Sequence, residues 1–297
     1  MKHQSLRGMI MVVIAAMLWG TTGTAQSFVP PQLSSYWVGT LRLVVAAAFF
    51  LPQLWVRGRS VMTGVTVRRL PWRGICLAAA CMSAYNLAFF AGVRSTGVAV
   101  GTALALGSGP IWAGVLQITI HRRLPKRIWW LGTGVAVVGV VAMVTGKDDG
   151  VPVSWLGVAL CLFAGLSYAT YAIVNQRMVS NASPFTVTAT VFTLAAMFAI
   201  PGAVGLSGVP DLHVSDVAIV LWLGVVSTGV AYLIFSHALR HVPAATGVVL
   251  TLAEPVTAFV LAIVVVGEQP GVSQGLGLGA VLAGLWLVVR SEIPNNE

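Results

Sequence analysis

The sequence has few charged residues, and acidic residues are the scarcest of them. Of its 297 residues, 8% are charged and 57% are hydrophobic. A soluble domain carries about 25% charged residues, so this composition excludes that class. The net charge of +9 could indicate nucleic-acid binding. However, the basic residues lie in the short gaps between apolar runs, as in membrane proteins. We therefore expect the protein to lie in a lipid bilayer and to bind no nucleic acid.

Catalytic, metal-binding and cofactor motifs are also lacking. The three cysteines, Cys76, Cys81 and Cys161, lie in apolar runs, and their spacing matches no metal or redox motif. There is no suggestive Ser-His-Asp spacing, no His/Cys cluster with metal-ligand spacing and no Walker motif. We therefore expect no enzyme, no metal and no cofactor. Any driving force must come from a gradient of ions or of substrate.

Ten apolar runs are long enough to cross a bilayer, which takes about 20 residues of helix. The sequence therefore predicts an all-α integral membrane protein of the cell (inner) membrane with multiple passes. The predicted spans are Gly8–Phe28, Ser35–Val56, Gly74–Val93, Gly97–Ile120, Ile128–Thr145, Val153–Val174, Phe185–Leu206, Val217–Ala238, Ala244–Gly267 and Val272–Arg290.

The distribution of Lys and Arg predicts the orientation. With the N-terminus inside, fourteen of the 17 basic residues fall on the inner side, two on the outer side, and Arg42 lies within a span. Cytoplasmic loops carry the excess of Lys and Arg. Both termini are therefore expected in the cytoplasm.

Two halves of the chain repeat one pattern. Pro110 and Pro255 are 145 residues apart, as are pairs of glycines further on, whereas upstream pairs such as Pro52 and Pro201 are 149 apart. The expected repeats are 1–146 and 151–291. Each contains five spans, and five is odd, so the second copy enters from the opposite side. We predict two inverted five-helix repeats, the architecture of secondary transporters.

Each repeat has a proline in the middle of its fourth span. Proline removes an amide donor and pushes away the carbonyl four residues back, so it breaks or kinks a helix. Gly109-Pro110 and Glu254-Pro255 are therefore the expected broken helices. Gly109, Pro110 and Pro255 are the predicted hinges about which one half rocks against the other.

Intramembrane charge is limited to Arg42 and Glu254. Arg42 binds a substrate carboxylate or counter-charge, or else it is a structural arginine bonded to helix carbonyls. Glu254 binds a substrate amine, takes up a proton, pairs with Arg42, or caps the broken helix. Gly109 stands where the second copy has Glu254, and Val191 stands where Arg42 would align. Each charge therefore comes from one half only.

Polar and aromatic residues deep in the spans favour a cavity for medium-sized or aromatic solutes, since phenol and indole groups combine an apolar face with one donor. With the two charges, the expected substrate-binding residues are Trp19, Thr22, Arg42, Tyr85, Asn86, Trp112, Tyr168, Tyr171, Tyr232 and Glu254.

The fifth and tenth spans carry small residues on one stripe, which lets helices approach closely. Packing within the fold explains the stripe, and homodimerisation is the alternative, so a monomer or a homodimer is expected. These residues are Gly132, Gly134, Gly139, Gly275, Gly279 and Ala283.

The chain resembles the drug/metabolite transporter superfamily, specifically its ten-helix EamA-type members, over almost its whole length. The motifs that carry the resemblance are Leu18-Trp19-Gly20, Arg42 with Ala46 and Pro52, Ala238-Leu239-Arg240, Leu252-Ala253-Glu254-Pro255-Val256 and Gly267-Glu268. The resemblance implies a central cavity between two five-helix halves. It also implies transport, often outward, of amino acids, other small metabolites or drugs. The chain is also similar to the branch that exports aromatic and neutral amino acids.

The sequence thus predicts a secondary transporter that exports aromatic or neutral amino acids, or similar small-molecule metabolites, by alternating access. One alternative is a proton-coupled exporter of lipophilic cationic drugs, which would use Glu254. The other is a membrane sensor or structural subunit that transports nothing.

Overall fold

The computed structural model describes residues 2–26, 33–60, 70–122, 124–144, 154–210, 214–267 and 271–292. The junction between the two expected repeats, 145–153, and Glu268 lie outside these residues. Every regular element in the described ranges is helical. The first repeat contains α1 (Lys2–Gln26), α2 (Ser35–Ser60), α4 (Trp72–Thr96), α5 (Val98–His121) and α6 (Arg127–Val144). The second contains α7 (Trp155–Val179), α8 (Pro184–Ser207), α9 (Val214–Leu221), η1 (Trp222–Val230), α10 (Ala231–Ala238), α11 (Ala244–Leu250), α12 (Ala253–Leu261), η2 (Ala262–Val266) and α13 (Val272–Glu292).

The apolar runs form membrane-spanning helices. Among the described residues, nine helical segments are long and apolar enough to cross a bilayer, and the shorter apolar helix Arg127–Met143 stands where the fifth span was predicted. The eighth span is continuous through α9, η1 and α10. The predicted all-helical, multi-pass architecture is confirmed.

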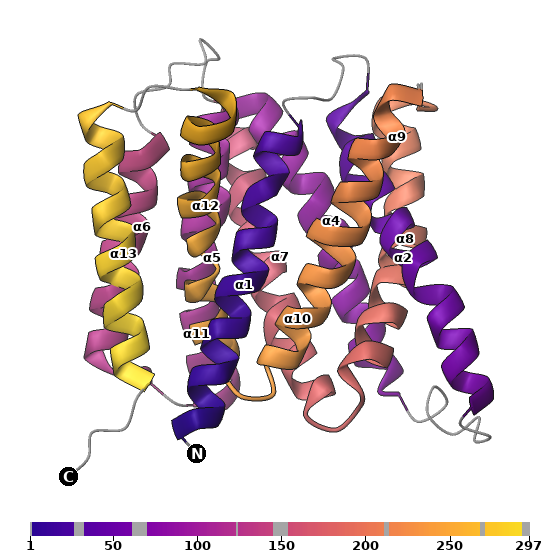
Figure 1. The fold of residues 1–297 in the computed structure, drawn as a ribbon, viewed down its shortest axis with the longest axis horizontal. Coiled ribbons are helices and arrows are strands. Elements are labelled where there is room, and N and C mark those ends of the chain that lie inside the picture. Colours follow the sequence, from indigo (N-terminus) through magenta and orange to yellow (C-terminus); the bar gives the residue numbers. More distant parts are fainter. Residues whose placement is uncertain are drawn as a thin grey trace.

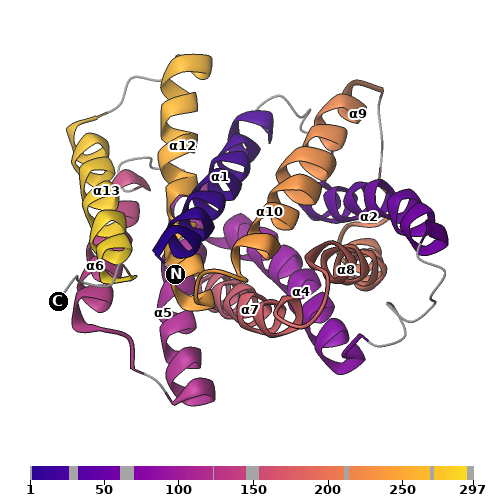
Figure 2. The same ribbon diagram turned by 60° about the horizontal axis from the view of Figure 1, so that its bottom comes forward.

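The helices form one bundle in which α6 and α13 pack together at one end, and α2 and α8 pack together at the other (Figures 1 and 2). Between these pairs, α7 packs against α4 and α5, while α1, its counterpart in the first repeat, packs against α10 and α12. Each repeat thus packs its first helix against the third and fourth spans of the other repeat. This reciprocal packing is the pattern of a pseudo-twofold axis. The start of α1 and the end of α13 lie at the same end of the bundle (Figure 1).

Glycines explain the close contact of α6 with α13, but only part of the predicted stripe contributes. A Cβ on Gly132 would lie 2.8 Å from the Gly284 carbonyl oxygen, and one on Gly139 would lie 2.7 Å from that of Gly277. Side chains here would separate the helices. In contrast, nothing lies within 4 Å of a Cβ on Gly134, Gly275 or Gly279. The stripe is therefore divided between a packed face and an open face.

The ninth span is broken, as predicted. The helix stops after α11 and resumes at Ala253, and the Glu254 amide donates to the Thr251 carbonyl at 2.9 Å. Pro255 stands in the first turn of α12, where a missing amide donor costs little.

The prediction of a broken helix at Pro110 is wrong, because α5 runs without interruption from Val98 to His121. A helix can continue through proline, whose φ is compatible with helical geometry, when packing compensates for the lost hydrogen bond and the displaced carbonyl. Tight packing supports this turn, since Gly107, Ser108, Gly109 and Pro110 are all buried.

Two stretches are π-helical, η1 in the eighth span and η2 in the ninth. In η1 the Thr228 hydroxyl donates to the carbonyl five residues earlier, Leu223, at 2.8 Å. Such i→i+5 segments are rare and often lie at functional sites. Segment η1 adjoins the cavity described next.

Candidate substrate-binding site

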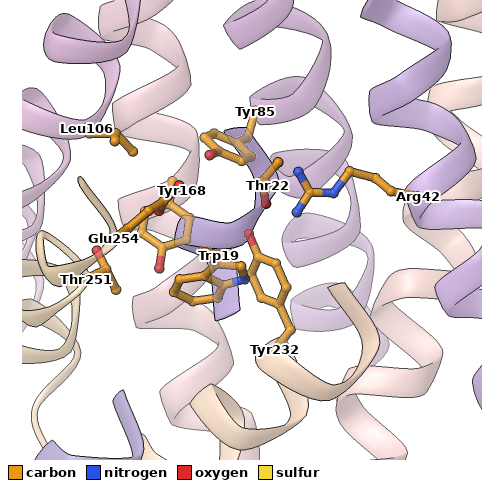
Figure 3. Close-up of a pocket in the computed structure, with 9 residues that line it drawn as sticks. All are labelled: Trp19, Thr22, Arg42, Tyr85, Leu106, Tyr168, Tyr232, Thr251 and Glu254. Carbon is orange, nitrogen blue, oxygen red and sulfur yellow. The ribbon is translucent and has the colours of Figure 1, made fainter. Parts of the chain in front are cut away.

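A cavity of about 30 Å³ lies between the two repeats (Figure 3). Its walls come from α1, α2, α4 and α5 of the first repeat, and from α7, α10, α12 and the break before α12 in the second. The lining residues are Trp19, Thr22, Arg42, Tyr85, Leu106, Tyr168, Tyr232, Thr251 and Glu254.

Arg42 reaches the cavity from α2 and is held by the other repeat. Its Nε donates to Thr228 Oγ1 at 2.8 Å, and its Nη2 lies 3.5 Å from the Ser227 carbonyl oxygen. The guanidinium points into the cavity near Thr22 and Tyr232 (Figure 3). The contact with the Ser227 carbonyl matches the predicted structural role, whereas the binding of a substrate carboxylate at the cavity stays a prediction.

Glu254 lies on the opposite side of the cavity, in the first turn of α12 (Figure 3). Within the described part of the chain, no ion pair joins it to Arg42, and no side chain or amide donates a hydrogen bond to its carboxylate. The predicted alternative of an Arg42–Glu254 ion pair is therefore not what the structure contains. A carboxyl group without a protein partner faces the Arg42 guanidinium across one small space.

Three buried polar atoms in the cavity wall also lack hydrogen-bond partners. They are Trp19 Nε1, Thr22 Oγ1 and Tyr168 Oη. Thr251 lies beside Tyr168, and its own hydroxyl donates to the Val248 carbonyl at 2.7 Å. A buried donor or acceptor left unpaired costs about 1–3 kcal/mol. A polar ligand that bonds to these atoms would recover that energy.

An aromatic cluster packs against the cavity. The Trp19 ring lies 4.7 Å from Tyr232, 5.5 Å from Phe235 and 6.3 Å from Tyr168, measured between centroids. Tyr85 lies 5.5 Å from Tyr168. These contacts fix the ring positions beside the cavity.

Seven of the ten residues expected at the site line this cavity, and three do not. Tyr171 is fully buried behind Tyr168 and bonds to Asn175 at 3.3 Å. Asn86 donates to the Met82 carbonyl at 2.8 Å within α4. Trp112 is half-buried on α5, away from the lining.

Sequence reasoning missed Leu106 and Thr251, although a signal for them exists. They are 145 residues apart, the spacing that relates Pro110 to Pro255, so they occupy equivalent positions in the two repeats. Trp19 and Tyr168, 149 apart, are equivalent in the same way. The cavity thus lies on the pseudo-twofold axis.

The two charges break this symmetry, because neither Gly109 nor Val191 supplies a matching charge. Gly109 lies near the cavity wall: a Cβ there would be 3.6 Å from Val248 and 4.0 Å from Tyr168. A ligand in the cavity therefore meets the Arg42 guanidinium on one side and the Glu254 carboxyl group on the other. No group of three or more His, Cys, Asp or Glu side chains that could hold a metal occurs among the described residues.

The bundle with its central polar cavity is that of a multi-pass inner-membrane transporter. The chain belongs to the EamA-like transporter family, whose model matches residues 6–145 and again residues 155–290. The second match corroborates the two-repeat organisation of the fold.

Two relatives and one solved structure resemble nearly the whole chain. The uncharacterized transporter YwfM of Bacillus subtilis is 33% identical, covering 97% of this chain and 95% of its own length. The threonine/homoserine exporter RhtA of Escherichia coli is 27% identical, covering 97% and 94%. A solved crystal structure with 16% identity superposes with a TM-score of 0.80, covering 94% and 95%. At that identity it supports the fold alone.

Proposed function

We propose that this protein exports small neutral amino acids across the inner membrane by alternating access through the central cavity. The observation that carries the proposal is the placement of Arg42 and Glu254 on opposite sides of one cavity without an ion pair between them. A zwitterion matches this arrangement, with its carboxylate at Arg42 and its ammonium group at Glu254.

The size of the cavity favours a small side chain. A buried water needs about 10–15 Å³ of such volume, so about 30 Å³ holds roughly two waters. Any free amino acid is larger than two waters, so the cavity must widen to bind one, and a small side chain requires less widening than an aromatic one. Of the predicted aromatic and neutral substrates, we therefore favour the small neutral ones. The relative named as a threonine/homoserine exporter supports the same choice.

The unpartnered polar atoms favour a side chain that can form hydrogen bonds. Trp19 Nε1 is a donor only, whereas the hydroxyls of Thr22 and Tyr168 both donate and accept. A hydroxylated side chain can bond to such a set, and an aliphatic one leaves it unpaired. Sites built around polar groups reject analogues that lack the matching group.

Alternating access would use the break in the ninth span. Segment α11 is buried along its length, whereas in α12 only Ala253 is buried. The outer part of this span can therefore move while the inner part stays packed, with Thr251 and Leu252 between them. In this proposal the hinge is at Pro255, whereas Gly109 and Pro110 stay within the continuous, buried turn of α5. The distribution of basic residues supports cytoplasmic termini.

The test is counterflow in proteoliposomes. Vesicles loaded with one unlabelled amino acid at a time would be assayed for uptake of labelled threonine. We expect uptake when the trapped solute is threonine, serine or homoserine, and little when it is phenylalanine. Vesicles that contain folded protein but show no counterflow with any amino acid would contradict the proposal.

A second candidate is the proton-coupled export of lipophilic cations. The observation in its favour is the position of Glu254 beside the aromatic rings of Tyr85 and Tyr168, which can bind a cation. This candidate predicts transport of lipophilic amines driven by a pH gradient, and no threonine counterflow. A sensor or structural subunit would bind threonine without any counterflow.

A further inference from the structure

We propose that Thr228, in the π-helical segment η1, is a positioning residue that fixes the Arg42 guanidinium at the carboxylate-binding end of the cavity. This inference rests on the proposed function for the identity of the ligand. The geometry that positions Arg42 stands independently of it.

The hydroxyl of Thr228 makes two hydrogen bonds, which fix its direction. It donates to the Leu223 carbonyl at 2.8 Å and accepts from Arg42 Nε at 2.8 Å. Thr228 is only 1% exposed, so both of its hydrogen bonds are shielded from bulk water. A guanidinium bonded at Nε by such an acceptor keeps one orientation, and bonds in a chain of this kind strengthen one another.

The π-helical register makes this arrangement possible. Thr190 and Thr193 on α8 donate to the carbonyl four residues earlier, at 2.8 Å in both cases. Thr228 donates to the carbonyl five residues earlier instead. This shift changes the direction in which its oxygen presents a lone pair. The π-helical segment is therefore part of the binding site, in keeping with the usual location of such segments.

The approach of α2 to η1 depends on Gly224. A Cβ there would overlap the side chain of Val45 and would lie 3.2 Å from the Arg42 carbonyl oxygen. The bare backbone of Gly224 therefore lets α2 lie close enough for Arg42 to reach Thr228.

The hydrogen bonds of Arg42 leave the outer edge of the guanidinium for a ligand. A guanidinium has five N–H donors. Within the described chain, one donor at Nε and one at Nη2 are used, and Nη1 has no hydrogen bond. The Nη1 and Nη2 edge can bind a carboxylate with two parallel hydrogen bonds. Loss of the Nε bond to Thr228 would let this edge rotate away from the ligand.

Three variants test the proposal. Thr228→Val removes the hydroxyl at nearly constant volume, Thr228→Ser keeps it, and Thr193→Val is the matched control. Thr193 also donates within its helix at 2.8 Å, but no arginine in the described ranges bonds to it. Thr193→Val therefore reports the cost of losing one such bond in a helix. Thermal unfolding of each purified protein would establish that it is folded.

The KM and Vmax of threonine transport measure how each variant changes substrate binding. We expect Thr228→Val to raise KM about tenfold with Vmax within about twofold, since one bond to a charged group is lost. Thr228→Ser and Thr193→Val should remain near the parent value. In an Arg42→Ala background, Thr228→Val should not raise KM any further, because Thr228 acts through the Arg42 guanidinium. An equal increment with and without Arg42 would overturn the proposal.

A second measurement reads the position of Arg42 without any substrate. In protein labelled with ¹⁵N-arginine, the Arg42 Nε–H signal, assigned by its loss in Arg42→Ala, should exchange slowly with water. It should exchange rapidly in Thr228→Val and remain slow in Thr193→Val. Unchanged exchange in Thr228→Val would overturn the positioning role. Faster exchange with an unchanged KM for threonine would support the positioning role, and it would contradict only the placement of the substrate carboxylate at Arg42.

Discussion

A methyl group at Gly20 tests whether the contact between α1 and α12 sets the position of Glu254. The Gly20→Ala variant would place its Cβ 2.6 Å from Thr257 Cβ, 2.7 Å from the Glu254 carbonyl oxygen and 3.1 Å from the Ala258 amide nitrogen. Two of these three atoms belong to the backbone and cannot rotate away. The two helices must therefore separate.

The structure sets the size of this separation. Ordinary contacts between carbon atoms begin near 3.4 Å, so α1 and α12 must move apart by about 0.8 Å. Overpacking of this kind costs about 1–3 kcal/mol. It would also carry the Glu254 carboxylate away from the cavity by a similar distance. Misplacement of a binding group by about 1 Å can cost up to about a hundredfold in rate.

The matched control is Gly279→Ala, because no atom lies within 4 Å of a Cβ at that position. Both variants add one methyl group to a helical glycine. We expect Gly20→Ala to lower the Tm of the purified protein by several degrees and to raise the KM for threonine about tenfold or more. Gly279→Ala should leave both unchanged or slightly raise Tm, because alanine favours a helix.

Thermal unfolding monitored by fluorescence and initial rates of counterflow would supply both values. A Gly20→Ala protein with the Tm and KM of Gly279→Ala would refute the reasoning. It would mean that the close approach of α1 to α12 has no part in holding the site.

Three further predictions concern the ligand and the packing. Glu254→Gln should raise the KM for threonine counterflow by about 10- to 30-fold without lowering Tm, because an uncharged amide cannot form an ion pair with an ammonium group; an unchanged KM would count against this role. Gly139→Ala should lower Tm by several degrees in thermal unfolding, since its Cβ would lie 2.6 Å from the Val281 amide nitrogen. Gln176→Ala should destabilise the folded protein by about 2–3 kcal/mol in denaturant unfolding, since it removes three hydrogen bonds to the α10–α11 connection.

The fold could be predicted from the sequence because the bilayer restricts the options. An apolar run of about 20 residues must be a helix in lipid, since its backbone has no other partner. Pairs such as Pro110 and Pro255 then identify the two repeats. What the sequence could not predict is the different outcome at these two prolines. Pro110 lies inside a fully packed turn, whereas the segment before Pro255 forms a tight turn at Thr251.

The site could be predicted in part, because a charge or a polar aromatic deep in a span must face protein or a cavity. Arg42, Glu254, Trp19 and Tyr168 followed from that rule. The rule cannot tell which buried face a residue occupies, so Tyr171 was expected in the lining although it packs behind Tyr168.

Two kinds of feature had no sequence signal that single-residue reasoning could use. Thr228 looks like any helical threonine, and its bond to Arg42 occurs in a π-helical segment that the sequence does not mark. Leu106 has no polar atom to mark it. Only its equivalence to Thr251 through the repeat connects it with the cavity.

The central claim is that the cavity binds a zwitterion between Arg42 and Glu254. Competition binding to the purified protein tests it most directly, with labelled threonine as the probe. The competitors would be threonine, its amide, which lacks the carboxylate, and the matching dihydroxy acid, which lacks the ammonium group. The account predicts that each analogue competes at least about tenfold less well than threonine, since each loses one charged contact. An amide that competes as well as threonine would contradict the role of Arg42, and an acid that does so would contradict the role of Glu254.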